Sequence, residues 1–294
     1  MAPRPTVSVI MTVLNGEDFL PLAVDSILRQ TFGDLELIVV DDGSTDSTPM
    51  QLRTIGDRRV RVIWNAANKG LPAALNIGIE AATGVFTAFL DHDDIALPFR
   101  LGCQINYLQS HPTIGMVGSA VEAIDGSGKV LKTVKMPRDS IAIRWMGLLE
   151  CPMRQSSLMG RTELVKRQLF SAQFPFYPDW DFIMRVARDT EVSNLPEMLV
   201  QYRRHNTNMS KINRARVDEN GIDLALREIR AELPDFPITR QEIADLRWVL
   251  FGAGQRTEKS LAMTRMVLRR YTQLQHAFNR KHAQLSGGLR QSAD

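Results

Sequence analysis

The chain has 294 residues, of which 44% are hydrophobic and 23% are charged, and its formal net charge is +3. This composition is ordinary for a globular protein, and the length allows one large domain with an appendage or two domains. The small net charge excludes a chain that binds nucleic acid through its overall charge. With only Cys103 and Cys151, the sequence has neither a disulfide framework nor a cysteine-based metal cluster.

The first residues lead into an apolar segment without the pattern of a signal peptide, and no stretch approaches about 18 consecutive apolar residues. We therefore expect a cytoplasmic protein whose two cysteines are reduced. Peripheral contact with the inner face of the membrane stays open, because a basic amphipathic helix would be enough for it.

Strand and helix patterns alternate through the first third of the chain. Apolar, β-branched segments predict four strands, at residues 7–13, 35–40, 60–64 and 85–90. Helical spacing of apolar residues predicts three helices between them, at residues 18–30, 47–55 and 71–82. This alternation predicts an α/β fold with a mostly parallel, Rossmann-like sheet flanked by helices, whose strand-end loops all meet at one edge.

The rest of the chain divides into a less regular middle and a helical end. Residues 114–124 and 130–134 predict a pair of strands joined by a Gly-Ser-Gly turn. From about residue 216 the spacing predicts helices only, at residues 217–232, 239–251 and 257–285. We therefore expect one domain over residues 1–215 and a helical C-terminal extension over residues 216–294.

Three carboxylates lie within four residues directly after the fourth predicted strand: Asp91, Asp93 and Asp94. Carboxylates this close repel one another unless a cation neutralises them, and hard oxygen ligands favour Mg²⁺ or Mn²⁺. Such an ion commonly shares its ligand shell with substrate phosphates. The pattern predicts a metal–diphosphate site, and a polar turn with an aspartate helix cap stays open as the alternative.

Polar loops follow the other three predicted strands as well. Together the four strand-end loops are Thr12–Gly16, Asp41–Ser44, Asn65–Gly70 and Asp91–Asp94. One such loop is weak support, because aspartate, glycine and serine are common in turns. Four of them at one sheet edge predict a nucleotide pocket.

The same loops belong to four segments that follow in order: Val7–Thr12, Ile38–Asp46, Asn68–Gly78 and Leu90–Pro98. In order and spacing they resemble the family 2 glycosyltransferases, which have the GT-A (nucleotide-diphospho-sugar transferase) fold. The resemblance covers about residues 6–101 and implies a nucleotide-binding half at 1–101 and an acceptor half at 102–215. It implies an inverting enzyme that takes a sugar from a nucleotide diphosphate, preferentially UDP, with Mn²⁺ or Mg²⁺.

The resemblance also implies roles for residues of the donor side. Thr12 and Asp42 would line the nucleobase pocket, and a carboxylate there can accept a hydrogen bond from a uracil N–H. Asn15, Asp41 and Asn68 would bind the nucleotide from the same loops.

Three further residues would serve the ribose and the diphosphate. Asp91 would bind the ribose side of the donor, and Asp93 would ligate the metal. The segment Tyr202-Arg203-Arg204-His205 resembles a late element of the family, which would bring His205 to the metal and the diphosphate. A surface histidine in a basic loop is the competing interpretation for His205.

The acceptor side would be served by the segment Pro178-Asp179-Trp180-Asp181, which resembles the family's Glu-Asp-x-Asp motif. Asp179 would then be the general base, with a helix N-cap as its competing interpretation. Trp180 and Asp181 would lie on the acceptor side, with Trp180 either stacked on an acceptor sugar or packed beneath the loop.

The sequence departs from the family pattern at Pro178, Leu75 and Leu14, where the family has a glutamate, an arginine and often an aromatic residue. These departures affect donor preference more than reaction class. The Gln-x-x-Arg-Trp element of processive synthases is missing, so the resemblance implies addition of a single sugar. The acceptor would be a hydroxyl of a glycan or lipid-linked molecule in cell-surface polysaccharide synthesis.

The last 36 residues, 259–294, are strongly basic, with seven lysines and arginines against one acid, or +6. Five apolar residues share one face at helical spacing: Val267, Tyr271, Leu274, Phe278 and Leu285. Either this face packs on the catalytic domain or on a second subunit in a homodimer, or the helix docks on an anionic membrane. Nucleic acid is not expected as a partner, because aromatic and basic residues are not interleaved.

Two other functions stay open at this stage. A phosphatase of the haloacid dehalogenase type also has an Asp-x-Asp after a strand, but the expected acidic loop downstream is not evident. A non-catalytic module that binds sugar nucleotides is the second alternative, and the substitution at Pro178 is what supports it.

Overall fold

The computed structural model describes residues 4–205, 214–251 and 258–291. Its strands are β1 (Val7–Val13), β2 (Leu35–Asp41), β3 (Val60–Trp64), β4 (Phe86–Phe89), β5 (Ile95–Ala96), β6 (Ile114–Asp125), β7 (Val130–Val134), β8 (Met159–Arg161) and β9 (Glu191–Arg204). The helices packed on them are α1 (Leu20–Leu28), α2 (Thr48–Arg53), α3 (Leu71–Ala81), α4 (Arg100–Ser110), α5 (Ser140–Gly147), α6 (Thr162–Gln168) and α7 (Pro178–Asp189), with a short 3-10 helix, η1 (Gln155–Ser157).

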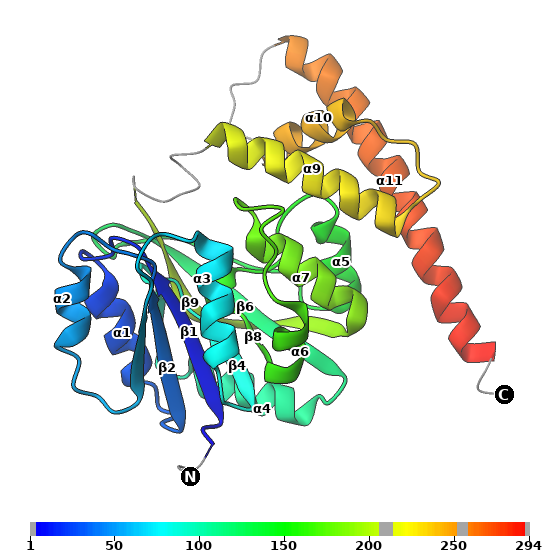
Figure 1. Ribbon diagram of the computed structural model, residues 1–294. Coiled ribbons are helices and arrows are strands. Elements are labelled where there is room, and N and C mark those ends of the chain that lie inside the picture. The colour runs from blue at the N-terminus through cyan, green and yellow to red at the C-terminus, as the bar shows by residue number, and fades with distance from the viewer. Residues whose placement is uncertain (1–3, 206–213, 252–257, 292–294) are drawn as a thin grey trace.

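Within the described residues the strands form one sheet in the order β3-β2-β1-β4-β8-β6-β9-β5, and β7 pairs with β6 (Figure 1). β1 pairs in parallel with β2 and β4, and β2 pairs in parallel with β3, as the alternation of strands and helices predicted. Antiparallel β8 joins β4 to β6, and β6 pairs in parallel with β9. The expected α/β class is confirmed, and the carboxyl ends of β1, β2 and β4 meet at one edge.

Apolar residues cover both faces of the sheet, because successive side chains of a strand point to opposite sides. On β1, Ile10 packs in the cluster that contains Ile79 of α3. Its neighbours Val9 and Met11 pack in the other cluster, with Ile27 of α1. This sandwich explains why the first strands are continuous apolar runs and why their polar residues gather where the strands end.

The helical extension consists of α9 (Arg214–Glu232), α10 (Arg240–Phe251) and α11 (Glu258–Gln291), which lie against α5 and α7 (Figure 1). Arg227 of α9 forms an ion pair with Asp181 of α7. The rings of Tyr271 and Phe278 on α11 lie 5.4 and 5.3 Å from the ring of Trp145 on α5. These contacts attach the extension to the acceptor half, and the domain boundary near residue 215 stays a prediction.

The apolar face predicted for the last helix is used inside the protein. Val267, Leu274 and Phe278 are at most 3% exposed and belong to the same core cluster as α5 and α7. Leu285 lies outside the side chains that the structure describes. Packing on the protein is therefore confirmed for this face. The face is not available to dock on a membrane. Among the described residues, no helix is both long and apolar enough to span a membrane.

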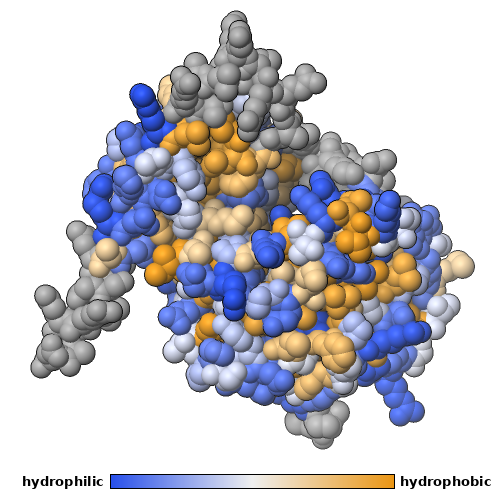
Figure 2. Space-filling view, turned by 180° about the vertical axis from the view of Figure 1, so that it is seen from behind, coloured by the Kyte–Doolittle hydropathy of each residue, from blue (hydrophilic) through white to orange (hydrophobic). Residues whose placement is uncertain are grey.

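Figure 2 shows hydrophobic residues gathered on the rear of the extension, below the residues drawn in grey. Among the side chains that the structure describes in α10 and α11, four large apolar ones are about half exposed: Trp248, Phe251, Met266 and Leu268. The extension thus buries one face of α11 while other apolar side chains remain in contact with solvent.

Candidate active site

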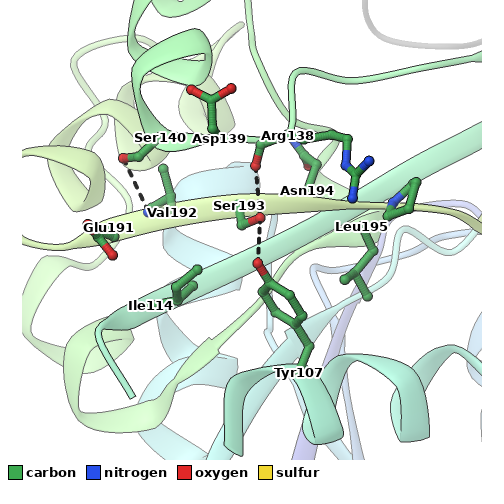
Figure 3. A pocket seen from close by; sticks show the side chains of 11 residues that line it. Tyr107, Ile114, Arg138, Asp139, Ser140, Glu191, Val192, Ser193, Asn194 and Leu195 are labelled. Carbon is green, nitrogen blue, oxygen red and sulfur yellow. Dashed lines mark hydrogen bonds between the residues drawn. The ribbon is translucent and has the colours of Figure 1, made fainter. Parts of the chain in front are cut away.

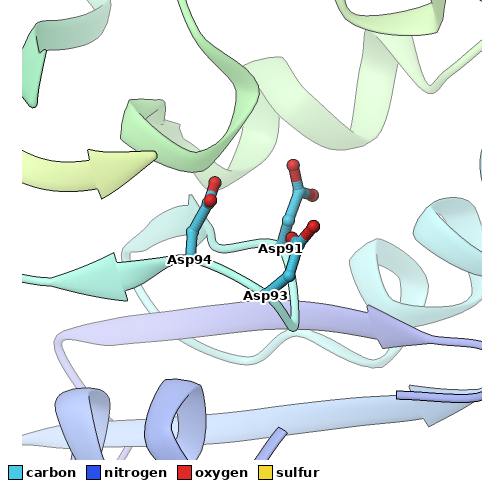
Figure 4. Close-up of side chains that lie close together, drawn as sticks. All are labelled: Asp91, Asp93 and Asp94. Carbon is cyan, nitrogen blue, oxygen red and sulfur yellow. The ribbon is translucent and has the colours of Figure 1, made fainter. Parts of the chain in front are cut away.

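The three predicted aspartates come together in the loop that follows β4. One carboxylate oxygen from each of Asp91, Asp93 and Asp94 lies within 4.8 Å of the others. In Figure 4, Asp91 and Asp93 project from the loop into the same space, whereas Asp94 points toward the end of a neighbouring strand. The loop begins where Leu90 N–H donates to the Ile10 carbonyl, so the sheet edge fixes its position.

His205 contacts this cluster from a distant part of the sequence. Its Nε2 lies 2.8 Å from Oδ2 of Asp93, 112 residues earlier, and both side chains are 15% exposed. Burial alone would raise the pKa of Asp93, but the hydrogen bond from His205 and the nearby His92 hold it below its usual value. A carboxylate oxygen beside an imidazole nitrogen fits a divalent cation such as Mn²⁺, which accepts both ligand types.

Asp91 is held by the segment that contains η1. Gln155 Nε2 donates to Asp91 Oδ1 at 2.5 Å, and the Asp91 N–H donates to Ser156 Oγ at 3.0 Å. Burial, and then the charge of Asp93, raise the pKa of Asp91 to about 7. No role was predicted for Gln155 or Ser156, since nothing in their own sequence pattern shows that they reach Asp91.

Asp94 joins the loop to the last strand. Its Oδ1 accepts from the Arg203 N–H at 2.7 Å, while Nε of Arg203 donates to the Asp93 carbonyl at 2.8 Å. Burial and then the charges of Asp93 and Asp91 raise the pKa of Asp94 well above its usual value. These bonds bring the end of β9, and with it His205, to Asp93. The sequence did not predict this role for Arg203, although its position two residues before His205 was a usable signal.

The second and third strand-end loops are fastened together by Asp42. Its carboxylate accepts from Asn65 Nδ2 and from the N–H groups of Lys69 and Gly70, at 2.8 to 3.1 Å. Asn68 Oδ1 accepts from the same Gly70 N–H at 2.8 Å. Asp42 is only 4% exposed, and its hydrogen bonds hold the two loops that shape the pocket. Its contact with a nucleobase stays a prediction.

The first and second loops are linked in a similar way. Asn15 has a φ of 52°, and its Oδ1 accepts from the Thr45 N–H at 2.8 Å, while its own N–H donates to Ser44 Oγ at 2.9 Å. Asp41 Oδ1 accepts from the Ser44 N–H at 2.9 Å. Thr12 is 7% exposed at the end of β1. The predicted nucleotide-binding residues are therefore together at one edge, and their ligand contacts stay predictions.

Asp179 lies in the first turn of α7, across from the aspartate cluster. The Cys151 Sγ lies 3.5 Å from its Oδ2 and 3.0 Å from the Met153 carbonyl, so the one S–H faces both oxygens. Burial raises the pKa of Asp179, and the positive charge of Arg154 opposes part of that rise. Asp179 in turn raises the pKa of Asp91, so the two carboxyl groups lie within electrostatic range of each other. A partly exposed carboxyl with a raised pKa has the properties of a general base.

The structure corrects both other predictions on this segment. Trp180 is fully buried, and its Nε1 donates to the Gly147 carbonyl at 2.9 Å. Asp181 is also fully buried and is paired with Arg185 and Arg227. For Trp180, the alternative of packing beneath the loop is confirmed. The expectation that Asp181 faces an acceptor is wrong, because successive helix positions point in different directions and, of these three residues, only Asp179 lies toward the cluster.

A separate cavity of about 570 Å³ lies at the opposite end of β9, next to α4 and the start of α5 (Figure 3). There Tyr107 donates to Ser193 Oγ at 3.0 Å, and Ser193 donates to the Arg138 carbonyl at 2.8 Å. Eight residues of strand, Glu197–Arg204, or roughly 25 Å, separate this cavity from the end of β9 at the aspartate cluster. It contains none of the predicted site residues.

Comparison with known proteins identifies the family. Residues 8–168 match the profile described as Glycosyl transferase family 2. An uncharacterized glycosyltransferase from Haemophilus influenzae is 32% identical over 223 residues, which span 71% of this chain and 68% of the relative. Another uncharacterized glycosyltransferase, from Methanocaldococcus jannaschii, is 31% identical over 206 residues, or 68% of this chain and 71% of that relative.

Solved structures share the fold. The crystal structure of Staphylococcus aureus TarS 1–349 in complex with UDP has a TM-score of 0.60 and 20% identity, over 84% of this chain and 70% of that one. The mannosyltransferase PcManGT from Pyrobaculum calidifontis, in complex with GDP-Man and Mn²⁺, has a TM-score of 0.61 and 19% identity, over 94% and 86% of the two chains. The GT-A fold is thereby confirmed. By the extent of the profile match and of the curated relatives, the chain belongs to glycosyltransferase family 2 and is a glycosyltransferase that uses a nucleotide-sugar donor.

Proposed function

We propose that this enzyme transfers a single sugar from a UDP-sugar to a hydroxyl of a glycan or lipid-linked acceptor, with inversion at the anomeric carbon. The observation that carries the proposal is the contact between Asp93 and His205, with the carboxyl of Asp179 across from it. A metal site and a base facing each other is what an in-line displacement at a sugar carbon needs.

On the donor side, Asp93 and His205 would hold Mn²⁺ or Mg²⁺. The ion would neutralise the diphosphate and so make the nucleotide a better leaving group. Gln155 fixes the carboxylate of Asp91 next to the metal ligands, where it can accept a hydrogen bond from the ribose. In support, PcManGT was solved with Mn²⁺, and TarS and PcManGT were solved with UDP and GDP-Man.

On the acceptor side, Asp179 would remove the proton from the attacking hydroxyl. The hydroxyl oxygen forms a bond to the anomeric carbon as the bond from that carbon to the diphosphate breaks, and the proton moves to Oδ of Asp179. The burial that raises the pKa of Asp179 makes its carboxylate a stronger base. The cell-surface polysaccharide pathway, the cytoplasmic location and the single-sugar product rest on family resemblance. Family membership favours neither a phosphatase nor a non-catalytic binding module.

The test is a thermal-shift series with UDP, GDP, CMP and dTDP, each with and without Mn²⁺. A ligand at 100 times its dissociation constant stabilises a protein by about 2.7 kcal/mol. Since each kcal/mol moves the melting temperature of a domain of this size by roughly 2–4 °C, the expected shift is roughly 5–10 °C. We expect such a shift for UDP, and only with Mn²⁺. A larger shift with another nucleotide would identify that nucleotide, and not UDP, as the carrier of the donor sugar. No shift with any of the four would refute the proposed donor site.

A further inference from the structure

One segment connects the two halves of the proposed site. At one end, the Cys151 thiol contacts Oδ2 of Asp179 at 3.5 Å. At the other end, Gln155 and Ser156 hold Asp91, on the side of the aspartate cluster. Arg154 lies between these ends, so its backbone is fixed within the site by neighbours on both sides.

Among the described residues, the guanidinium of Arg154 has no hydrogen-bonding partner. Its side chain makes no hydrogen bond, and no ion pair within 4.0 Å, in the part of the chain that the structure describes. By contrast, the guanidinium of Arg203 donates to the Asp93 carbonyl, and that of Arg247 lies 3.6 Å from Glu150. Arg154 is nevertheless largely withdrawn from solvent, with a residue exposure between those of the buried and exposed classes.

Five N–H donors without acceptors are costly in such a place, because a partly buried guanidinium loses hydrogen bonds to water that nearby charges alone do not replace. A planar guanidinium binds carboxylate and phosphate groups through two parallel hydrogen bonds. An arginine left unpaired beside a substrate site is therefore matched to an anionic group on a substrate.

We propose that Arg154 binds a phosphate or carboxylate group of the acceptor, next to the hydroxyl that receives the sugar. This proposal rests on the proposed function, because it takes Asp179 as the base at which that hydroxyl is placed. It assigns the enzyme an anionic acceptor, such as a sugar phosphate, a lipid-linked phosphate or a uronate-containing glycan.

The surroundings of Arg154 favour the acceptor over the donor diphosphate. Burial lowers the pKa of Arg154, but Cys151, Tyr202, Glu150 and Asp179 together raise it above its usual value. Three of these four groups belong to the segment before η1 or to α7, on the acceptor side. The donor diphosphate already has its own cation at the proposed metal ligands, so a second cation near the base is free to select the acceptor.

The proposal is tested by titrating the full-length protein with methyl phosphate and with acetate, with and without saturating UDP and Mn²⁺. We expect at least one of the two anions to bind the wild type, and Arg154→Met to bind it at least about tenfold more weakly, as expected for a charge-assisted bidentate contact. Arg154→Lys should keep part of the affinity, since lysine retains the positive charge but cannot donate the two parallel hydrogen bonds of a guanidinium. Arg138→Met is the matched control, because Arg138 is exposed and lies at the opposite end of β9.

Several results would overturn the proposal. They are equal binding of the anion by wild type and Arg154→Met, no binding of either anion by the wild type, or a tenfold loss of UDP affinity in Arg154→Met with anion binding unchanged. The proposal would also be overturned if Arg154→Met lost affinity for UDP-glucuronate and kept its affinity for UDP-glucose. That result would mean that Arg154 binds an anionic group on the transferred sugar and not on the acceptor. Melting temperatures within about 2 °C of the wild type would show that the variants are folded. Because the anions are also titrated without nucleotide, a failure of UDP to bind counts against the proposed function and leaves the test of Arg154 intact.

Discussion

Replacing Asp179 by asparagine is the most direct test of the chemistry. The change keeps the size of a side chain that is held among Cys151, Arg154 and the start of α7, and it removes the basic oxygen. A positioned general base contributes about 10²–10⁴-fold to a rate, and each factor of ten corresponds to about 1.36 kcal/mol. We expect kcat to fall by that factor, or about 3–5 kcal/mol in activation free energy, with donor affinity unchanged within about twofold.

Stability should move in the other direction, which separates chemistry from folding. Burial raises the pKa of Asp179 in the folded protein above its ordinary value of 3.8. The folded state therefore prefers the protonated carboxyl, and its stability decreases as the pH rises from the unfolded pKa through the folded one. Asp179→Asn removes this unfavourable ionisation, so its melting temperature at pH 7 should equal or exceed that of the wild type.

The assay is initial-rate kinetics from pH 4 to 9, with nucleotide release and product formation measured together. In the wild type, kcat/KM should decline as the pH falls through the raised pKa of Asp179, at a pH above 3.8, and this decline should be absent from the residual rate of Asp179→Asn. Asp189→Asn, the same change near the other end of α7, is the control. A rate for Asp179→Asn within about fivefold of the wild type, with the same pH profile, would exclude Asp179 as the base.

Four further outcomes are expected. Asp93→Asn and His205→Ala each remove one proposed ligand and should weaken Mn²⁺ by at least about tenfold in a UDP thermal-shift titration, and an unchanged response would remove that residue from the metal site. Asp181→Asn breaks a buried pair with two arginines and should cost about 3 kcal/mol in urea unfolding, so a cost below about 1 kcal/mol would contradict the ion-pair role. Trp180→Phe should cost about 1–3 kcal/mol through the Gly147 carbonyl left unpaired, without a change in acceptor KM. Phe278→Ala should cost about 3–5 kcal/mol, because its ring is 1% exposed against α5, and stability equal to the wild type would argue that α11 is not packed there.

The first half of the fold was predictable because its signals are local. Strands at residues 7–13 and 60–64 have the same bounds in the sequence prediction and in the structure. Continuous apolar runs bounded by turn residues report burial on both faces of a parallel sheet, and no distant contact is needed to recognise them. By contrast, β5 and β8 have two and three residues, too few to show any period, and they form because β9 and β4 offer them unpaired backbone groups.

The candidate site divides in the same way. The sequence by itself determined which residues could serve it, because Asp91 and Asp93 follow an apolar strand and Asp179 begins a helix. It could not determine orientation: the buried ion pair of Asp181 depends on Arg227, 46 residues away in the extension. Only the tertiary structure placed His205 on Asp93 and left Arg154, between Asp179 and Asp91, without a hydrogen-bonding partner among the described residues. The residue types determine which chemistry the side chains can perform, whereas packing between segments far apart in the chain determines the direction of each side chain.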